Sequence, residues 1–441
     1  MPANKKSFYL LSLGCPKNEV DSDGLASMLM HEGWQMAQRP QDAEVIVVNT
    51  CSFIAPAVEE SLEAIMELGD LREEGSRRLI VAGCLVSRYG RGSLAPLLPE
   101  VDLWAEPRDY PRFSVMVGEL TGEDIQYRQS SGYREHASTL ARGFVYIKLS
   151  EGCDRRCTYC AIPAIRGPLR SRPREEIVEE ARLFLGYGAR EIILVAQDTT
   201  SYGSDIYGRP SLPDLLDDLG EGSGEWWLRV MYTHPEGIDD DVLRAMKDTR
   251  VCRYLDLPFQ HADAGVLKTM GRKGDADSHR GLLARIDECI GEMAVRATFM
   301  VGFPGEDEKA YKVMRDFIAA ARFDWLGLFS YSHEEGTPAF SLGKGVPVSV
   351  ARARHRELAD MQEEIMREKA LALVGKEMRV LLECESAEVP GFWEGRSQRE
   401  APEIDGVIFI ADASGLEPGS LVDVLITSSE GIDLVGTLRS G

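Results

Sequence analysis

The first part of the chain alternates short apolar runs with stretches of helical periodicity. The apolar runs cover residues 6–14, 44–50 and 78–83, and continuous runs of this length are typical of strands buried in parallel sheets. Between them, residues 18–31 and 55–71 carry apolar side chains at helical spacing. This βαβαβ pattern predicts a small doubly wound α/β domain.

Strand and helix patterns then alternate six times from residue 142 onward. The strands are expected near residues 143–149, 191–196, 227–233, 253–258, 296–302 and 325–331. A helical pattern follows each strand, for instance over residues 173–187, with Pro173 at its start and glycines near its end. Six such units predict a partial (β/α) barrel, whose chemistry lies at the carboxyl ends of its strands.

The last part of the chain has the pattern of short strands, after a long charged helix predicted over residues 348–373. Apolar runs separated by Gly and Pro occur at residues 378–384, 406–410, 421–426 and 434–437. They predict a five-stranded antiparallel β-barrel of the kind that binds an oligonucleotide or a protein. Residues 106–141 are polar with little periodicity and are interpreted as a linker or docking hairpin. The predicted domains are therefore 1–120, 142–374 and 375–441, with a linker over 121–141.

Composition agrees with a protein of several globular domains. The 441 residues are 44% apolar and 28% charged, and no run of about 18 apolar residues exists, so we expect no membrane span. Nine cysteines fit a reducing cytosol better than a disulfide framework, which predicts a cytoplasmic location. The net charge of −22 repels phosphate backbones and favours basic partners.

Three cysteines crowd into one loop at CxxxCxxC spacing: Cys153, Cys157 and Cys160. A structural zinc site uses four protein ligands and a ferredoxin run needs a fourth Cys, but no further Cys or His lies close by. The charged residues between the cysteines argue against three thiols that merely pack in a core. Three thiolates can hold a four-iron cluster and leave one iron open to a cofactor.

A second trio is predicted from topology. Cys15, Cys51 and Cys84 each follow one of the first three apolar runs. The carboxyl ends of strands in an open α/β sheet line one crevice, so these thiols should converge there. Any one of them alone is equally well read as a small core residue. Together they suggest a second cluster with an open position.

Polar and glycine-rich residues follow the predicted barrel strands. Gln197, Asp198 and Arg229 are candidates to hold the polar ends of a cofactor, and Gly302 and Gly305 would let the backbone approach it closely. His234 and His261 stand at strand ends, where a structural role and a site role are both open. Cys252, Cys289 and Cys384 have no partners at ligand spacing and are interpreted as incidental thiols.

The CxxxCxxC loop resembles the cluster motif of the radical S-adenosylmethionine superfamily, and the three predicted domains together resemble the methylthiotransferases. That resemblance implies two 4Fe-4S clusters, one on Cys15, Cys51 and Cys84 and one on Cys153, Cys157 and Cys160. It also implies S-adenosylmethionine as the source of a radical and of a methyl group, and a terminal TRAM domain. No catalytic acid or base is identified.

Two branches of this family differ in substrate. The segments Leu13-Gly-Cys-Pro-Lys-Asn18, Asp256-Leu-Pro-Phe-Gln-His261 and Arg399-Glu-Ala-Pro-Glu-Ile-Asp-Gly406 look like the RimO branch, which modifies the β-carbon of an aspartate of small-subunit ribosomal protein twelve. The MiaB branch acts on tRNA adenosine and typically shows Gly-Cys-Gln-Met-Asn at the first segment. Residues 375–441 hold five basic and thirteen acidic side chains, the opposite of what an RNA-binding barrel requires.

We therefore expect a ribosomal protein as partner and no direct contact with nucleic acid. The family resemblance also implies a reducing electron donor such as a flavodoxin or a ferredoxin. A tRNA methylthiotransferase is the alternative within this reaction class. A non-catalytic iron-sulfur electron carrier or an RNA-binding scaffold is the alternative outside it.

Overall fold

The computed structural model describes residues 6–71, 77–126, 135–221, 223–411, 413 and 415–439. Contacts within the chain divide it into two compact units. The amino-terminal unit comprises Met1–Ser138, Glu151–Asp154 and Ala161–Arg170, and the barrel unit comprises Thr139–Ser150, Arg155–Cys160 and Ser171–Gly441. No helix in the described ranges is long and apolar enough to cross a membrane.

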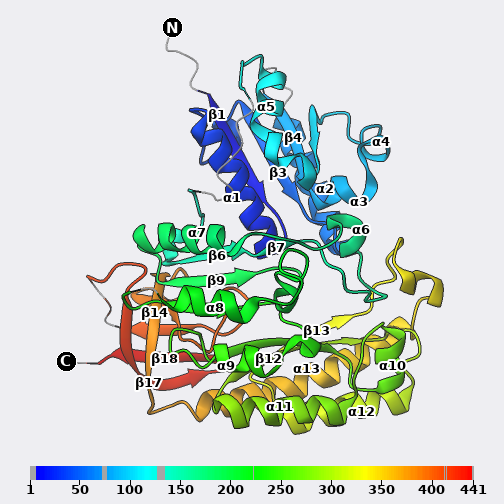
Figure 1. Ribbon diagram of the computed structural model, residues 1–441, viewed down its shortest axis with the longest axis vertical. Coiled ribbons are helices and arrows are strands. Elements are labelled where there is room, and N and C mark those ends of the chain that lie inside the picture. The colour runs from blue at the N-terminus through cyan, green and yellow to red at the C-terminus, as the bar shows by residue number, and fades with distance from the viewer. Residues whose placement is uncertain are drawn as a thin grey trace. The chain divides into compact units, whose positions relative to one another are not determined.

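The amino-terminal unit is built on a parallel sheet of strand order β2-β1-β3-β4-β5 (Figure 1). Helices α1 and α5 pack on one face, and α2, α3 and α4 pack on the other, so the doubly wound prediction is confirmed. The strands are β1 (Ser7–Ser12), β2 (Gln35–Met36), β3 (Val45–Thr50), β4 (Arg78–Gly83) and β5 (Leu103–Ala105). The helices are α1 (Pro16–His31), α2 (Ala55–Asp70), α3 (Cys84–Tyr89), α4 (Arg91–Leu94), α5 (Phe113–Thr121) and α6 (Ile162–Arg166).

The interpretation of residues 106–141 as a linker is wrong for its first half. A 3-10 helix over Pro107–Arg112 leads into α5, whose Phe113 and Val117 are fully buried against Phe8 and Leu25. This segment therefore completes the core of the amino-terminal unit. Residues 127–134, where a docking hairpin was expected, lie outside the described residues.

The barrel unit contains the six parallel strands that the pattern predicts. They form two sheets of order β10-β9-β6 and β11-β12-β13, and backbone hydrogen bonds join Leu228 of β10 to Arg250 and Cys252 just before β11. The strands are β6 (Phe144–Lys148), β9 (Glu191–Val195), β10 (Trp227–Val230), β11 (Tyr254–Gln260), β12 (Ala294–Val301) and β13 (Trp325–Ser330), and the short strands β7 (Ser150–Glu151) and β8 (Arg170–Ser171) lie where the chain passes between units. The helices are α7 (Arg174–Gly186), α8 (Leu212–Gly220), α9 (Asp240–Ala245), α10 (Ala264–Thr269), α11 (Ala276–Ile290), α12 (Glu308–Ala321) and α13 (Val348–Leu371).

The carboxyl-terminal strands close into a five-stranded barrel of order β14-β15-β16-β18-β17, as expected. One pairing differs from the antiparallel prediction, because β16 and β18 run parallel. Strand β17 lies between β16 and β18 in the sequence and runs antiparallel to β18, so β16 and β18 have the same direction, which local alternation alone does not reveal. The strands are β14 (Glu377–Glu385), β15 (Phe392–Arg396), β16 (Ile408–Ala411), β17 (Leu421–Glu430) and β18 (Asp433–Leu438).

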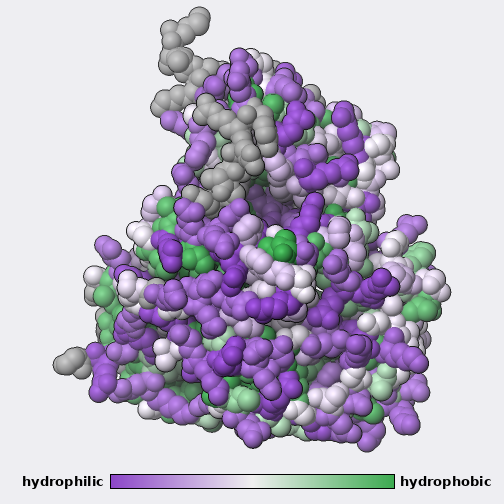
Figure 2. All heavy atoms as spheres, viewed as in Figure 1, coloured by the Kyte–Doolittle hydropathy of each residue, from purple (hydrophilic) through white to green (hydrophobic). Residues whose placement is uncertain are grey.

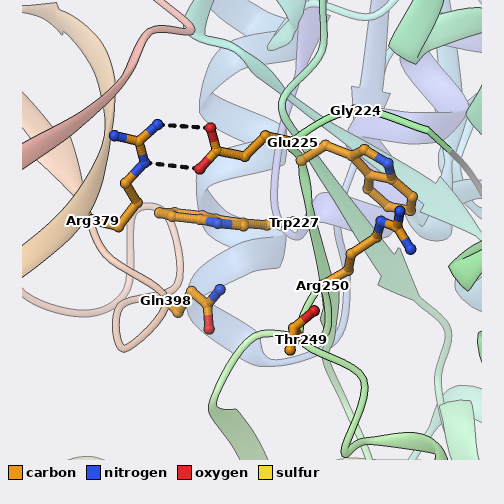
Figure 3. Close-up of a pocket in the computed structure, with 8 residues that line it drawn as sticks. Gly224, Glu225, Trp227, Thr249, Arg250, Arg379 and Gln398 are labelled. Carbon is orange, nitrogen blue, oxygen red and sulfur yellow. Dashed lines mark hydrogen bonds and ion pairs between the residues drawn. The ribbon is translucent and has the colours of Figure 1, made fainter.

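This terminal barrel covers the amino-terminal ends of the larger barrel's strands. Arg396 pairs with Glu191 at the start of β9 at 2.7 Å, and Arg399 pairs with Asp324 just before β13, also at 2.7 Å. A hollow of about 470 Å³ lies in the same region, where Arg379 and Glu225 form a two-pronged ion pair beside Trp227 (Figure 3). The carboxyl ends of the strands, where barrels of this class carry their active sites, take no part in these contacts.

Candidate functional site

Three cysteines stand at one edge of the sheet in the amino-terminal unit. Cys15 precedes α1 shortly after β1, Cys51 directly follows β3, and Cys84 directly follows β4. Strands β1, β3 and β4 are neighbours, with Ser12 paired to Asn49 and Thr50 paired to Gly83. Parallel pairing therefore brings these three positions to adjacent strand ends, as topology predicts.

The backbone around these thiols is tightly held. Gly14 has a φ of +91°, and a Cβ there would lie 2.8 Å from the Cys51 sulfur, so only glycine fits. The Asn18 side chain donates to the carbonyl oxygens of Leu13 and Asn49 at 2.6 and 3.1 Å. Two cysteine-bearing loops are thus fixed to one amide, which explains why the segment Leu13–Asn18 carries this asparagine.

A buried arginine completes this cluster of side chains. Arg166, at the end of α6, donates to the Cys84 sulfur from Nε at 3.2 Å and from Nη2 at 3.0 Å. It also pairs with Asp21 at 2.6 Å and with Glu151 at 3.2 Å, and only 4% of the residue is exposed. A cation in this position favours a thiolate at Cys84 over a neutral thiol.

For two of these thiols, Cys51 and Cys84, the effect of burial on the pKa outweighs that of Arg166. Burial raises the pKa of Cys84 to about 11, although Arg166 acts in the opposite direction. Burial likewise raises the pKa of Cys51. All nine cysteines fall in the described part of the chain and all are free, so no disulfide competes for these sulfurs.

The donor set has the chemistry of an iron-sulfur cluster. Within the described ranges, no three His, Cys, Asp or Glu side chains converge so as to hold one metal ion. A four-iron cluster instead spreads three thiolates over three different irons, and its net charge is stabilised by hydrogen bonds to sulfur. Three strand-end thiols with one guanidinium on a sulfur match that requirement.

The CxxxCxxC loop belongs partly to each unit. In the amino-terminal unit, the Cys153 amide donates to the Gly167 carbonyl at 3.1 Å. In the barrel unit, the Cys160 amide donates to the Cys157 carbonyl at 3.1 Å, and the Thr158 amide donates to the Met270 carbonyl at 2.9 Å. The stretch with Cys157 and Cys160 is therefore anchored to the turn after α10.

The structure connects Asp198 to this loop. Arg155, which stands between Cys153 and Cys157, donates to the Asp198 carboxylate at 2.7 Å. Burial alone would raise the pKa of Asp198, but Arg155 and the hydroxyls of Ser201 and Thr200 outweigh it and hold the pKa below its usual range. Gln197 is half-buried beside it, directly after β9. Both residues stand at the carboxyl end of a barrel strand, as predicted.

The two glycines predicted near a cofactor have different surroundings. A Cβ on Gly302 would lie 2.9 Å from the Ala351 side chain, so this glycine permits close packing of α13. A Cβ on Gly305 would meet nothing within 4 Å. Glu306 accepts from the Gly302 amide at 2.8 Å and pairs with Arg354 at 2.6 Å, which ties the loop after β12 to α13.

Arg229 lies away from the other predicted cofactor residues. Its guanidinium is fully buried, pairs with Glu191 at 2.6 Å, and donates to the carbonyls of Ser397 and Gln398. These partners belong to the amino-terminal end of β9 and to the terminal barrel. These contacts favour a structural role for Arg229 and not a place in the cofactor site.

The two histidines at strand ends cap turns. His234 Nδ1 accepts from the Glu236 amide at 3.3 Å, and His261 Nδ1 accepts from the Asp263 amide at 2.9 Å. Burial, Arg272 and Arg155 lower the pKa of His234 to about 3. Both rings therefore have a local structural function, whatever else they contact.

Three family models match consecutive parts of the chain. Residues 7–106 match the Uncharacterized protein family UPF0004, residues 147–318 match the Radical SAM superfamily, and residues 374–438 match the TRAM domain. Among solved structures, the radical S-adenosylmethionine methyltransferase TsrM of Kitasatospora setae aligns with a TM-score of 0.57 at 14% identity, over 94% of this chain and 80% of that chain. The structural likeness concerns the fold.

Curated relatives align over almost their whole length. The ribosomal protein uS12 methylthiotransferase RimO of Pelotomaculum thermopropionicum is 42% identical over 97% of this chain and 98% of that protein. The protein of the same name from Acetivibrio thermocellus is 38% identical, over 98% of each chain. With all three domains matched in order, this chain belongs to the RimO family of radical S-adenosylmethionine methylthiotransferases.

Proposed function

We propose that this enzyme attaches a methylthio group to ribosomal protein uS12, at the β-carbon of an aspartate. The relatives named above carry the uS12 substrate in their names. The observation that supports the proposal most directly is the trio of strand-end cysteines with Arg166 on the Cys84 sulfur, because sulfur insertion needs a second cluster beside the radical one.

Six cysteines are proposed to hold two iron-sulfur clusters. Cys15, Cys51 and Cys84 would hold the auxiliary cluster, with Arg166 donating to one ligand sulfur. Cys153, Cys157 and Cys160 would hold the radical cluster, whose open iron binds S-adenosylmethionine as the source of a carbon-centred radical. Gln197 and Asp198, beside the CxxxCxxC loop, are proposed to orient the cofactor, and Gly305 to leave it space.

The surface charge of the terminal barrel supports a protein substrate. Its arginines are engaged in ion pairs: Arg396 and Arg399 pair with the larger barrel, Arg379 with Glu225 and Asp423, and Arg439 with Glu377. Carboxylates at Glu385, Glu388, Glu417 and Glu430 remain exposed. An acidic surface attracts a basic, RNA-binding ribosomal protein and repels a tRNA backbone.

Mass spectrometry of small-subunit proteins tests the proposal. A strain lacking the gene should yield uS12 without the methylthio mass increment, and re-expression of the wild-type chain should restore it. Nucleosides from total tRNA of the same strains provide the control, and they should be unchanged. Unmodified adenosine in tRNA together with normal uS12 would contradict the proposed substrate.

A further inference from the structure

A continuous series of aromatic rings leads from the CxxxCxxC loop to the protein surface. Tyr159 lies between Cys157 and Cys160 in sequence, and its ring meets Phe303 edge-on with centroids 6.4 Å apart. Phe303 meets Tyr331 at 5.1 Å, and Tyr331 meets His333 at 6.4 Å. His333 is stacked on Phe340 at 4.2 Å with the ring planes 15° apart. These contacts place π-systems at every step between the loop and Phe340.

The segment at the outer end is fixed to the loop by hydrogen bonds. The Ala339 amide donates to the Thr158 carbonyl at 2.8 Å, and the Tyr331 hydroxyl donates to the Ala339 carbonyl at 3.2 Å. A Cβ on Gly345 would lie 3.1 Å from the Tyr331 ring, so the backbone passes directly over it. Residues 331–346 therefore form one ordered structure with the cysteine loop.

The outer end of this series is an exposed apolar patch. Phe340 is 41% exposed, Leu342 46% and Val348 67%. Figure 2 shows an apolar area on the side of the barrel unit where Figure 1 draws the yellow segment after β13. Contiguous exposed apolar patches on proteins often mark interaction sites.

Basic side chains are concentrated in the segment that carries Phe340, Leu342 and Val348, in a protein that is acidic as a whole. The sequence from Gly336 to Arg356 contains no Asp or Glu, although the whole chain carries a net charge of −22. Lys344, Arg352 and Arg356 are exposed in this stretch, whereas Arg354 turns inward to Glu306. Apolar and cationic side chains together fit an acidic partner protein. The same cations repel a basic ribosomal protein, so the substrate is not the expected occupant.

We propose that Phe340, Leu342 and Val348, with Lys344, Arg352 and Arg356 in the same stretch of the chain, form the docking surface for an acidic one-electron carrier protein. The ring series from Phe340 to Tyr159 is the path by which the electron reaches the CxxxCxxC loop. One electron leaves the carrier, which is oxidised, and one electron enters the cluster on Cys153, Cys157 and Cys160. No proton and no covalent bond is exchanged at the docking surface. This inference rests on the proposed function, since reductive cleavage of S-adenosylmethionine consumes one electron per event.

Two reductants separate docking from chemistry. Formation of 5′-deoxyadenosine is measured in the reconstituted full-length enzyme with sodium dithionite, and separately with a purified acidic flavodoxin in its fully reduced state. Lys344→Glu/Arg352→Glu should lower the flavodoxin-driven rate about tenfold at low ionic strength, because the surface then repels the carrier. The dithionite-driven rate should stay at the wild-type value. Added salt should slow the wild-type reaction with flavodoxin only.

A matched control and a second variant complete the experiment. Arg182→Glu/Tyr187→Ser changes an exposed cation and an exposed ring on and just after α7, on the opposite side of the barrel unit in Figure 1, and should leave both rates unchanged. Phe340→Leu keeps the apolar surface and removes the stacked ring, so flavodoxin affinity, measured by isothermal titration calorimetry, should match the wild type while the flavodoxin-driven rate falls. Equal flavodoxin-driven rates in wild type and both patch variants would overturn the docking surface. Absence of dithionite-driven cleavage in the wild type would instead contradict the proposed function.

Discussion

Arg166 connects two segments of the sequence that carry different cysteines. It follows Cys160 by a single short helix, and its guanidinium is bound to Cys84, Asp21, Glu151 and Asn18. A buried cation with two carboxylates and one sulfur acceptor is strongly held, and removing it leaves those partners without compensation. This side chain therefore controls the local charge at the auxiliary cysteines.

Replacement of this arginine should damage one cluster and spare the other. Arg166→Met is expected to reduce bound iron by about half and to lower the free energy of unfolding by about 3–5 kcal/mol, the usual cost of breaking a buried ion pair. Iron quantification and thermal unfolding of the anaerobic protein check both effects.

Arg170→Met is the matched control, because this exposed residue is in the same segment of the chain. It should retain full iron content and wild-type stability. Iron loss of equal size in both variants would show that the segment, rather than the guanidinium on Cys84, determines cluster binding.

The protein should lose stability on acidification because two buried histidines have lowered pKa values. Burial lowers the pKa of His234 to about 3 and, together with Arg272, outweighs a hydrogen bond to lower that of His279 to about 4. The unfolded chain binds protons at these residues near its usual pKa of about 6.5, so stability falls as the pH drops below that value. At pH 5 the loss amounts to about 2 kcal/mol for each histidine.

His279→Asn isolates one of these contributions. The variant loses packing against Phe259, with a ring centroid distance of 4.4 Å in the wild type, but that loss is independent of pH. Between pH 7 and pH 5 its free energy of unfolding should decline by about 2 kcal/mol less than that of the wild type. Denaturant unfolding at both pH values measures the difference, and parallel pH profiles would show that His279 titrates normally.

At the scale of elements, a buried network of charges attaches the terminal barrel to the larger one. Arg396 bridges Glu191 of β9 and Glu383 of β14, and Arg229 and Arg142 contact the same two carboxylates. The pKa of Glu191 lies below its usual range because these arginines outweigh the effect of burial. Removing one partner of such a network costs more stability than replacing the whole network by apolar side chains.

Arg396→Met should therefore destabilise the protein by about 3–5 kcal/mol, since it leaves two buried carboxylates short of a partner. Arg439→Met removes an exposed pair with Glu377 in the same barrel and should cost at most about 1 kcal/mol. Denaturant unfolding of both variants measures the contrast. Similar values for the two would mean that the buried network adds nothing to stability.

Elements with strong periodicity were predictable from sequence, and elements that tertiary contacts create were not. The six barrel strands and α13 appear where the apolar pattern places them. Strand β15 was missed because Glu394 and Gly395 interrupt its apolar pattern, although Gly395 is required where a Cβ would lie 2.6 Å from the Leu381 carbonyl. Helix α5 was missed because its surroundings are polar and its partners, Phe8 and Leu25, lie far back in the sequence.

The candidate site follows the same rule. Strand ends locate Cys15, Cys51 and Cys84, because parallel topology is a regular consequence of the βαβ pattern. Arg166 has no comparable signal, since Asp21 and Cys84 are remote from it in sequence. The strand pattern alone predicts Arg229 near a cofactor, but its guanidinium donates to the carbonyls of Ser397 and Gln398 beside the terminal barrel's strand β15, contacts that a strand pattern cannot reveal.

At the scale of the whole molecule, the proposed function requires two clusters with separate ligand sets. The auxiliary set is contained in the amino-terminal unit, and the other set is carried by the loop through which the chain passes between units. The acidic terminal barrel and the cationic patch after β13 give the two proposed protein partners surfaces of opposite charge. Opposite charge lets each partner recognise its own surface and avoid the other.

Iron and sulfide quantification, with electron paramagnetic resonance, tests this central claim most directly. It compares anaerobically reconstituted wild type with the triple variant Cys15→Ala/Cys51→Ala/Cys84→Ala. The account predicts that the variant binds about half the iron and sulfide of the wild type and still cleaves S-adenosylmethionine, because the ligands of the radical cluster are intact. Unchanged iron content in the triple variant would contradict the account.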